Sequence, residues 1–388
     1  MPSPENMRVT LWGTRGSYPS FPTHREVRAY AESVSSETIA YVRERFHSEG
    51  GLDELRELFR RSPEEIENEL SISYPPIFGG ETTCIEIETS EGNVIILDCG
   101  SGIRKCAAEI LKRRSETKLN EISLFGSHAH LDHRSGLSFA GICFANPPFD
   151  IQVFGCSGFL KALDARFALF SHNASESTYS DDPIDYASMS ASFRGIEICT
   201  TDKEEELVDA VPWEVRDIAE PIMIGSTAVQ PFMSYHGLTE CLGYRIEHGG
   251  KSFVFSTDHE KLSPEMISLS NLGSEEVEKS MRVDQELVEI CQGADLAYFD
   301  GQYCREEYLG RQGIGSSPAV SRVGWGHGCV EDILDRVSQT EIKRALIGHH
   351  DPERSWSGLV EMAEQLQEFS AGKDFQVELA RDGLTVNL

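Results

Sequence analysis

Apolar positions recur along the chain in two patterns, and each pattern predicts a kind of element. Short apolar or alternating runs bounded by Gly, Asn, Asp or Ser predict strands. Such runs lie within 7–17, twice within 78–100 on either side of a turn, and at 122–125, 151–154, 228–233, 242–247, 252–256, 294–300, 344–347 and 376–380. Helices are predicted at 103–114, near 158–170, from 330 onward and at 357–369.

An insertion at 22–76 separates the first predicted strand from the next. Apolar side chains recur at helical spacing from Ile39 to Phe46. The Gly-Gly pair at 50–51 predicts a break between two helices. The Ser-Pro pair at 62–63 predicts the start of another, because Pro is favoured at the first helical position. The insertion is therefore either a helical decoration packed on the core or a lid or dimer contact near an active site.

A second segment, 170–215, is polar and rich in Ser and Asp, and we predict that it is a long surface loop. Its His172 is expected to be solvated rather than to bind a metal. The sequence shows no internal repeat, and its 388 residues are enough for one large domain. We therefore predict a single domain, 1–388, that carries both the insertion and the loop.

Composition and charge indicate which partners and which cellular location to expect for the protein. The formal net charge of −29 disfavours broad contact with a nucleic-acid backbone, because the surface repels polyanions. No run of about 18 or more apolar residues predicts a membrane-spanning helix, and no basic-then-apolar leader predicts secretion. The ten cysteines are scattered and none forms a CxxC pair, so buried, reduced thiols in a cytoplasmic protein are expected.

The strongest chemical signal follows the strand at 122–125. There His128, His130, Asp132 and His133 lie within six residues. Imidazole and carboxylate groups suit zinc and similar divalent ions. In an extended stretch His128 and His130 point the same way, because side chains alternate with a period of two. Asp132 and His133 then lie where the chain turns and can face a second ion. A histidine-rich polar loop without a metal is the alternative.

This pattern, HxHxDH followed by GL, resembles the metallo-β-lactamase superfamily of binuclear metallohydrolases. GTRGS after the first strand, GGxTxC before the second and DxGxG after the third resemble the same superfamily. The later segments H…GYRIE…STD, GHG and HHDP are more similar to its ribonuclease Z-like, phosphodiesterase-type branch than to β-lactamases. The resemblance implies an α/β fold: a four-layer αβ/βα sandwich with metals at one edge, between two sheets, and the helical insertion added near the N-terminus.

The resemblance also implies two divalent metal ions and a set of ligands. His128, His130 and His236 would hold one ion, Asp132, His133 and His349 would hold the other, and Asp258 would bridge them. By themselves, His236 and Asp258 would be interpreted as ordinary turn residues at strand ends, and the upstream HxHxDH motif is what favours the metal-binding interpretation. His349 is chosen because it is the first histidine after its strand. His350 is the alternative ligand or a phosphate contact.

Further residues are candidates for catalysis or support. Asp132 is also placed to orient the nucleophile or accept its proton. His327 would protonate the leaving oxygen, although a structural histidine at a helix start is a serious alternative. Asp300, at the end of a strand, would orient a ligand histidine or cap a turn. His259 matches no ligand position and is expected to support a ligand or to be exposed.

We therefore expect a metal-dependent hydrolase, and within that class a phosphodiesterase acting on a small cyclic or linear nucleotide through a hydroxide that bridges the ions. Zinc is the expected metal, with manganese, iron and cobalt as alternatives. The other hypotheses are a ribonuclease Z-like RNA endonuclease, a hydrolase of lactones, thioesters or β-lactams, and a metal-binding regulatory protein without turnover. The expected partner is a small anionic substrate, with no stable nucleic-acid partner and no membrane. A homodimer stays open, because many relatives dimerise.

Overall fold

A computed structural model of the protein describes residues 6–62, 76–117, 119–167, 169–170, 189–200, 211–269 and 272–388. An eight-stranded sheet forms one half of its core. Neighbouring strands are antiparallel from β15 to β3 and parallel from β3 to β7. In spatial order they are β15 (Thr385–Asn387), β1 (Met7–Gly13), β2 (Cys84–Thr89), β3 (Val94–Leu97), β4 (Glu121–Phe125), β5 (Asp150–Gly155), β6 (Ser192–Cys199) and β7 (Glu214–Asp217).

A seven-stranded sheet forms the other half. Its strands are antiparallel from β8 to β11 and parallel from β11 to β14. In spatial order they are β14 (Gln376–Leu379), β13 (Arg344–Gly348), β12 (Leu296–Asp300), β11 (Lys251–Ser256), β10 (Thr239–His248), β9 (Thr227–His236) and β8 (Ile222–Ile224).

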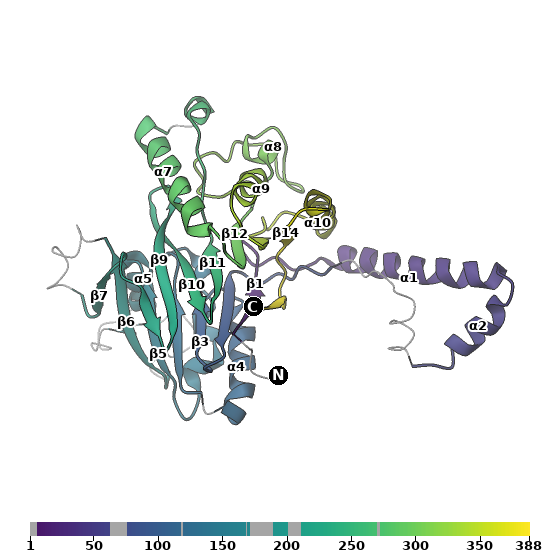
Figure 1. The fold of residues 1–388 in the computed structure, drawn as a ribbon, viewed down its shortest axis with the longest axis horizontal. Helices are drawn as coiled ribbons and strands as arrows, with labels where there is room; N and C mark the ends of the chain where they lie inside the picture. The colour runs from purple at the N-terminus through teal and green to yellow at the C-terminus, as the bar shows by residue number, and fades with distance from the viewer. Residues whose placement is uncertain are drawn as a thin grey trace.

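The two sheets face each other across one apolar core. Phe125 of the first sheet stacks on Phe154 at 4.4 Å and meets Tyr244 of the second edge-on at 5.2 Å. Helices cover the outer face of each sheet (Figure 1). On the first sheet these are α4 (Ile103–Thr117) and α5 (Ser157–Phe167). On the second sheet they are α7 (Ser274–Cys291), α9 (Val330–Gln339) and α10 (Trp356–Ser370), with the short α8 (Arg305–Tyr308) nearby. This arrangement confirms the predicted four-layer αβ/βα sandwich.

One part of the sequence-based prediction is wrong. The segment 170–215 was expected to be a surface loop, yet Ser192–Cys199 forms β6, and its last five residues are buried beside β5. The strand lies among polar residues, so burial against a parallel neighbour, which the local sequence does not show, decides its conformation. Most of the rest of that loop, including His172, falls outside the described residues.

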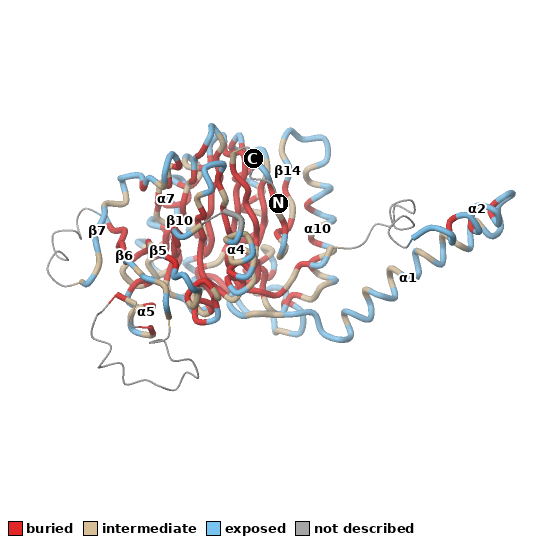
Figure 2. Tube along the Cα trace, turned by 90° about the horizontal axis from the view of Figure 1, so that it is seen from below, coloured by how far each residue is buried: buried red, intermediate tan, exposed pale blue. Residues whose placement is uncertain are grey.

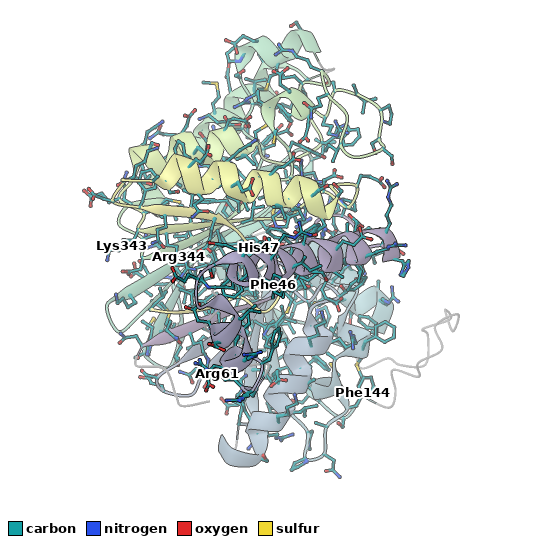
Figure 3. The ribbon with its side chains drawn as sticks, turned by 90° about the vertical axis from the view of Figure 1, so that its right-hand side faces the viewer. Phe46, His47, Arg61, Phe144, Lys343 and Arg344 are labelled. Carbon is teal, nitrogen blue, oxygen red and sulfur yellow. The ribbon has the colours of Figure 1, made fainter. Side chains whose placement is uncertain are left out.

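The insertion contains two described helices, α1 (His24–His47) and α2 (Gly51–Leu58), which together we call the arm. The Gly pair does separate them: Gly50 has a φ of +78° and α2 begins at Gly51. The arm projects away from the sandwich, and no residue of α1 is buried (Figures 1 and 2). Figure 3 looks at its outer end, where Phe46 lies on α1. The helix predicted from 62–63 falls outside the described residues.

The arm is anchored at its base rather than along its length. The Glu26 carboxylate accepts a hydrogen bond from the Trp356 backbone N–H at 2.8 Å, and the Tyr30 and Trp356 rings meet edge-on at 5.5 Å.

No helix within the described ranges is both long and apolar enough to cross a membrane. None of the ten cysteines forms a disulfide, and nine of them are buried.

Candidate metal centre

Several predicted site residues meet at one edge of the second sheet. Strands β9, β11, β12 and β13 share one direction, because β9 and β11 both run antiparallel to β10 and the others are parallel to β11. Their carboxyl ends therefore lie together. His236 ends β9, Asp258 follows β11 by two residues, Asp300 ends β12 and His349 follows β13.

The opposite wall comes from the first sheet. Strand β4 ends at Phe125, and the chain then passes His128 and His130 before a short 3-10 helix, Leu131–His133. That turn brings Asp132 and His133 back toward the sheet edge, and His128 and His133 are fully buried. The sequence prediction that Asp132 and His133 lie where the chain turns is thus confirmed.

Four non-glycine residues near this edge adopt a left-handed backbone conformation: Ser17 (φ +60°), Asp98 (φ +59°), Asp258 (φ +48°) and His349 (φ +56°). This conformation is costly for residues with a Cβ and persists where surrounding structure enforces it, often at functional sites. Ser17 uses it to aim its N–H at the Asp132 carboxylate, 2.8 Å away. The described backbone carries this strain only around the site.

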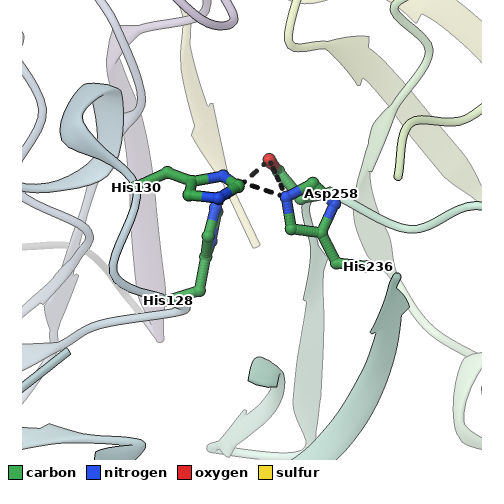
Figure 4. Close-up of side chains that lie close together, drawn as sticks. All are labelled: His128, His130, His236 and Asp258. Carbon is green, nitrogen blue, oxygen red and sulfur yellow. Dashed lines mark hydrogen bonds and ion pairs between the residues drawn. The ribbon is translucent and has the colours of Figure 1, made fainter. Parts of the chain in front are cut away.

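The first group of potential ligands consists of His128, His130, His236 and Asp258. Their ring nitrogens and carboxylate oxygen lie within 4.8 Å of one another, and the side chains converge on one point (Figure 4). His130 Nδ1 and His236 Nε2 are 3.0 Å apart. Asp258 Oδ2 is 3.4 Å from His128 Nε2 and 3.6 Å from His236 Nε2. This is the set that the sequence predicted for one ion.

The second group consists of Asp132, His133 and His349. The Nε2 atoms of the two histidines are 3.3 Å apart, and Asp132 Oδ2 is 3.2 Å from His133 Nε2 and 3.3 Å from His349 Nε2. Asp258 Oδ1 lies 3.3 Å and 3.2 Å from the same two nitrogens. Asp258 therefore presents one oxygen to each group.

The sequence did not identify three of the groups that contact these histidines. His133 Nδ1 lies 2.7 Å from Asp98 Oδ2, His349 Nδ1 lies 3.1 Å from Gln302 Oε1, and His236 Nδ1 lies 2.7 Å from the Gly326 carbonyl. A ring whose Nδ1–H donates to such an acceptor directs its Nε2 lone pair into the site, a common arrangement around metals. Asp98 could have been found, because it directly follows the buried strand β3, much as the candidate Asp300 ends β12.

The donor set fits divalent cations. His128 Nε2 and Asp258 Oδ2 are buried and have no hydrogen-bond partner, which is costly without a bound group. The facing Nε2 atoms of His133 and His349 need a proton or a metal cation between them. Burial lowers the pKa of His133, but Asp258, Asp132 and Asp98 outweigh it and raise that pKa well above its usual value. The site therefore favours positive charge.

The charge states of the other groups also suit metal binding. Burial lowers the pKa of His128 well below its usual value, and burial, partly offset by Asp258, lowers the pKa of His236 to about 4. Burial opposes charge on Asp132, but His133 and His349 hold its pKa well below the usual range. Neutral imidazoles and ionised carboxylates are the forms that coordinate metals.

A third group places His327 and Asp300 beside Asp258 and His349. His327 Nδ1 is 3.0 Å from Asp300 Oδ2 and 3.7 Å from Asp258 Oδ2. Burial alone would lower the pKa of His327, but Asp300 and then Asp258 raise it to about 9. Asp300 also lies 3.6 Å from His349 Nδ1, so it contacts both histidines and holds His327 more closely.

Two histidines considered in the sequence lie outside these groups. His350 donates its Nε2–H to the Ala380 carbonyl at 2.8 Å, and burial lowers its pKa to about 3. Between the two neighbours, the structure thus brings His349 rather than His350 to the metal groups. His259 is buried, not exposed, and lies between the Tyr235 N–H and Asp284.

No family model and no curated protein sequence matches this chain. Solved structures do match its fold. They include a diphosphatase of the PhnP family (14% identity, 98% of each chain, TM-score 0.50). Zn²⁺-bound PqqB from Methylobacterium extorquens (12% identity, 98% of this chain and 100% of that one) has a TM-score of 0.53. Unliganded yeast PDE1 (11% identity, 99% of each chain) has a TM-score of 0.52. The chain thus has the metallo-β-lactamase fold, which confirms at the level of the fold the resemblance seen in its motifs.

Proposed function

We propose that this protein is a binuclear metal-dependent phosphodiesterase that hydrolyses a small anionic diester, with a cyclic or linear nucleotide as the preferred substrate. The observation that carries the proposal is the position of Asp258, whose two oxygens face two separate groups of histidines. Similarity in fold to a protein named as a diphosphatase and to yeast PDE1 supports phosphoryl chemistry.

The residues of the first group would hold one ion and those of the second group the other, with Asp258 shared. Zinc is the expected metal, and manganese or iron would also suit imidazole and carboxylate ligands. Two such ions, when bound, acidify water and neutralise charge on a phosphoryl group. Asp132 would orient the attacking water, because its Oδ2 faces the site and is fixed by the Ser17 N–H.

His327 would deliver a proton to the leaving oxygen. Asp300 holds its Nδ1 at 3.0 Å, so the other ring nitrogen is free to act on substrate. The side chain keeps 12% of its surface exposed, and His130 of the first group is also exposed, so solvent can reach this part of the site. Proton transfer by a positioned histidine contributes about 10²- to 10⁴-fold to rate.

Charge supports a small substrate over a nucleic acid. The chain carries 64 acidic and 35 basic residues, so a long polyanion would meet repulsion over most of the surface. A single phosphodiester needs only the local field at the metal centre, where bound cations dominate. We also propose a cytoplasmic location, which suits ten free thiols.

The proposal is tested by loading the protein with zinc or manganese and measuring hydrolysis of bis-p-nitrophenyl phosphate and 3′,5′-cyclic AMP. Asp132→Ala should abolish both activities. His327→Ala should slow cyclic AMP hydrolysis more than p-nitrophenolate release, because p-nitrophenolate leaves without much help from an acid.

Other outcomes would redirect the assignment. Cleavage of precursor tRNA with neither diester hydrolysed would favour an RNA endonuclease. Turnover of lactones, thioesters or β-lactams alone would place the chemistry at carbon rather than phosphorus. Protein that binds two ions and turns over nothing would be a metal-binding regulator.

A further inference from the structure

A buried carboxylate fixes the turn that precedes His327. Glu260, fully buried and two residues beyond Asp258, accepts hydrogen bonds from the Gly324 N–H at 2.6 Å and the Gly326 N–H at 2.8 Å. The Tyr308 hydroxyl donates to the same carboxylate at 2.5 Å. Both glycines have positive φ, +86° and +88°, which other residues adopt only at a cost. The turn is thus fixed on both sides of the residue between them.

That residue is Trp325, and 55% of it is exposed. It lies next to Gly326, whose carbonyl contacts His236 Nδ1 at 2.7 Å, and two positions before His327. Because neighbouring Cα atoms are about 3.8 Å apart, the Trp325 Cα is within about 8 Å of the His327 Cα. The backbone of Trp325 therefore lies beside residues that contact or belong to the candidate site.

The underside of the turn is also rigid. The Arg322 guanidinium lies over the Trp325 ring at 5.9 Å and over the Tyr303 ring at 5.4 Å. Arg322 is buried and donates to the Glu307 carbonyl at 2.8 Å and the Val320 carbonyl at 3.2 Å. One face of the indole thus rests on a fixed cation, while much of the side chain remains open to solvent.

A large aromatic side chain that stays exposed on a fixed turn does not contribute the stabilising free energy that its burial would give. Two other exposed apolar residues also lie within two positions of proposed site residues: Leu131 (52% exposed), between His130 and Asp132, and Leu238 (102% exposed), after His236. The loops that carry the metal centre therefore present apolar groups to solvent, although the protein is strongly acidic.

We propose that Trp325 is a stacking platform that binds a flat aromatic group of the substrate, such as a nucleobase, while the phosphodiester lies at the metal centre. The inference rests on the proposed phosphodiesterase function and specifies its substrate class. Trp325 is then a specificity-determining residue, and Glu260 positions it.

Two diesters with the same leaving group separate stacking from chemistry: thymidine 5′-p-nitrophenyl phosphate and methyl p-nitrophenyl phosphate. Trp325→Ala should raise KM for the thymidine diester by about 10-fold or more, the size of one base–aromatic contact, with kcat little changed. KM for the methyl diester should stay within about twofold of wild type, since it has no ring to stack. Trp325→Phe should recover most of the thymidine affinity.

Phe46→Ala is the matched control, because it also removes an exposed aromatic ring, 57% exposed, but on the arm. It should leave both substrates unchanged. A second readout is direct binding: thymidine 5′-monophosphate should quench tryptophan fluorescence of the metal-loaded wild type, and Trp325→Ala should lose that response.

Equal changes on both diesters, or unchanged thymidine KM in Trp325→Ala, would overturn the platform while leaving the phosphodiesterase proposal intact. If the metal-loaded wild type hydrolyses neither diester, the proposed function fails. The fluorescence titration with thymidine 5′-monophosphate then tests the stacking role of Trp325 on its own. Quenching that persists in Trp325→Ala would reject that role.

Discussion

The candidate metal centre and the arm differ in how far apart in the sequence their contacting residues lie. At the centre, His133 meets Asp98 and His349, which are 35 and 216 residues away. On the arm, the Arg28–Glu32 and Arg56–Asp53 ion pairs join residues one helical turn apart, and their side chains are mostly exposed. The centre therefore exists only in the folded sandwich, whereas local sequence accounts for the arm's helices.

The difference extends to what each contact contributes. Exposed ion pairs contribute about 0–1 kcal/mol, because water and salt screen them. Buried charges stay in place only if paired, hydrogen-bonded or metal-bound, and removing one partner costs about 3–5 kcal/mol. Substitutions at the candidate metal centre should therefore have large effects on stability and metal binding that extend to residues distant in the sequence. Substitutions on the arm should have small, local effects.

The largest effect is expected from Asp258→Ala, which removes the group shared by both ligand sets. Metal content should fall, and diester hydrolysis should fall by at least about 10³-fold. Chelation should lower the unfolding temperature of the wild type but not of the variant, because bound ligand stabilises only the native state. Glu32→Ala, an exposed carboxylate on the arm, should change neither quantity.

The next effect is at the junction of arm and sandwich. The Asp382 carboxylate accepts the Gly80 and Glu81 N–H groups at 3.0 and 3.1 Å, where the chain returns from the insertion. Burial raises its pKa to about 6, despite these hydrogen bonds. A folded-state pKa above the usual value favours folding at low pH, and this contribution is lost as pH rises through about 6.

Between pH 4 and pH 7, the stability of the wild type relative to Asp382→Asn should therefore fall by about 2 kcal/mol. Urea unfolding at several pH values measures this difference. A constant difference across the range would show that Asp382 titrates normally in the folded protein.

A smaller effect is expected from Asp98→Asn, because Asp98 contacts His133 and not the metal positions directly. Loss of the carboxylate next to a ligand histidine typically lowers metal affinity by about 10- to 100-fold. Competition with a coloured chelator measures this, and circular dichroism checks the fold. Asp53→Asn, the same change on α2, serves as control. Unchanged affinity in Asp98→Asn would mean that the ring of His133 is held by other contacts.

The smallest effect is expected from replacing 22–76 with a short Gly-Ser linker. The ends of the insertion are already close, since the Ser20 N–H donates to the Gly80 carbonyl at 3.0 Å. The unfolding free energy should fall by about 1–2 kcal/mol through loss of the Glu26–Trp356 hydrogen bond, with activity on methyl p-nitrophenyl phosphate retained. Loss of that activity in folded protein would instead make the arm part of the site.

The order of most elements could be predicted from the sequence, because the pattern of apolar residues is local. The ligand candidates could also be predicted, because a His or Asp at the end of a predicted strand is a local signal. Helix α4 and strands β9 to β13 lie where expected, within a few residues at their ends. Strand β6 was missed because its partner is distant, and α7 was not predicted. Gln302 and the Gly326 carbonyl were missed because neither has a distinctive pattern.

The sequence by itself determined the arm's first helix and the chemistry of HxHxDH. Thr23 and Glu26 form a capping box, with hydrogen bonds of 3.3 and 2.8 Å between residues three apart. Only the tertiary structure decided that His349, and not His350, faces the ligand groups and that Asp258 divides its oxygens between them. Local interactions fix a helix end, but the direction of a side chain after a strand depends on which partners the folded sheets bring beside it.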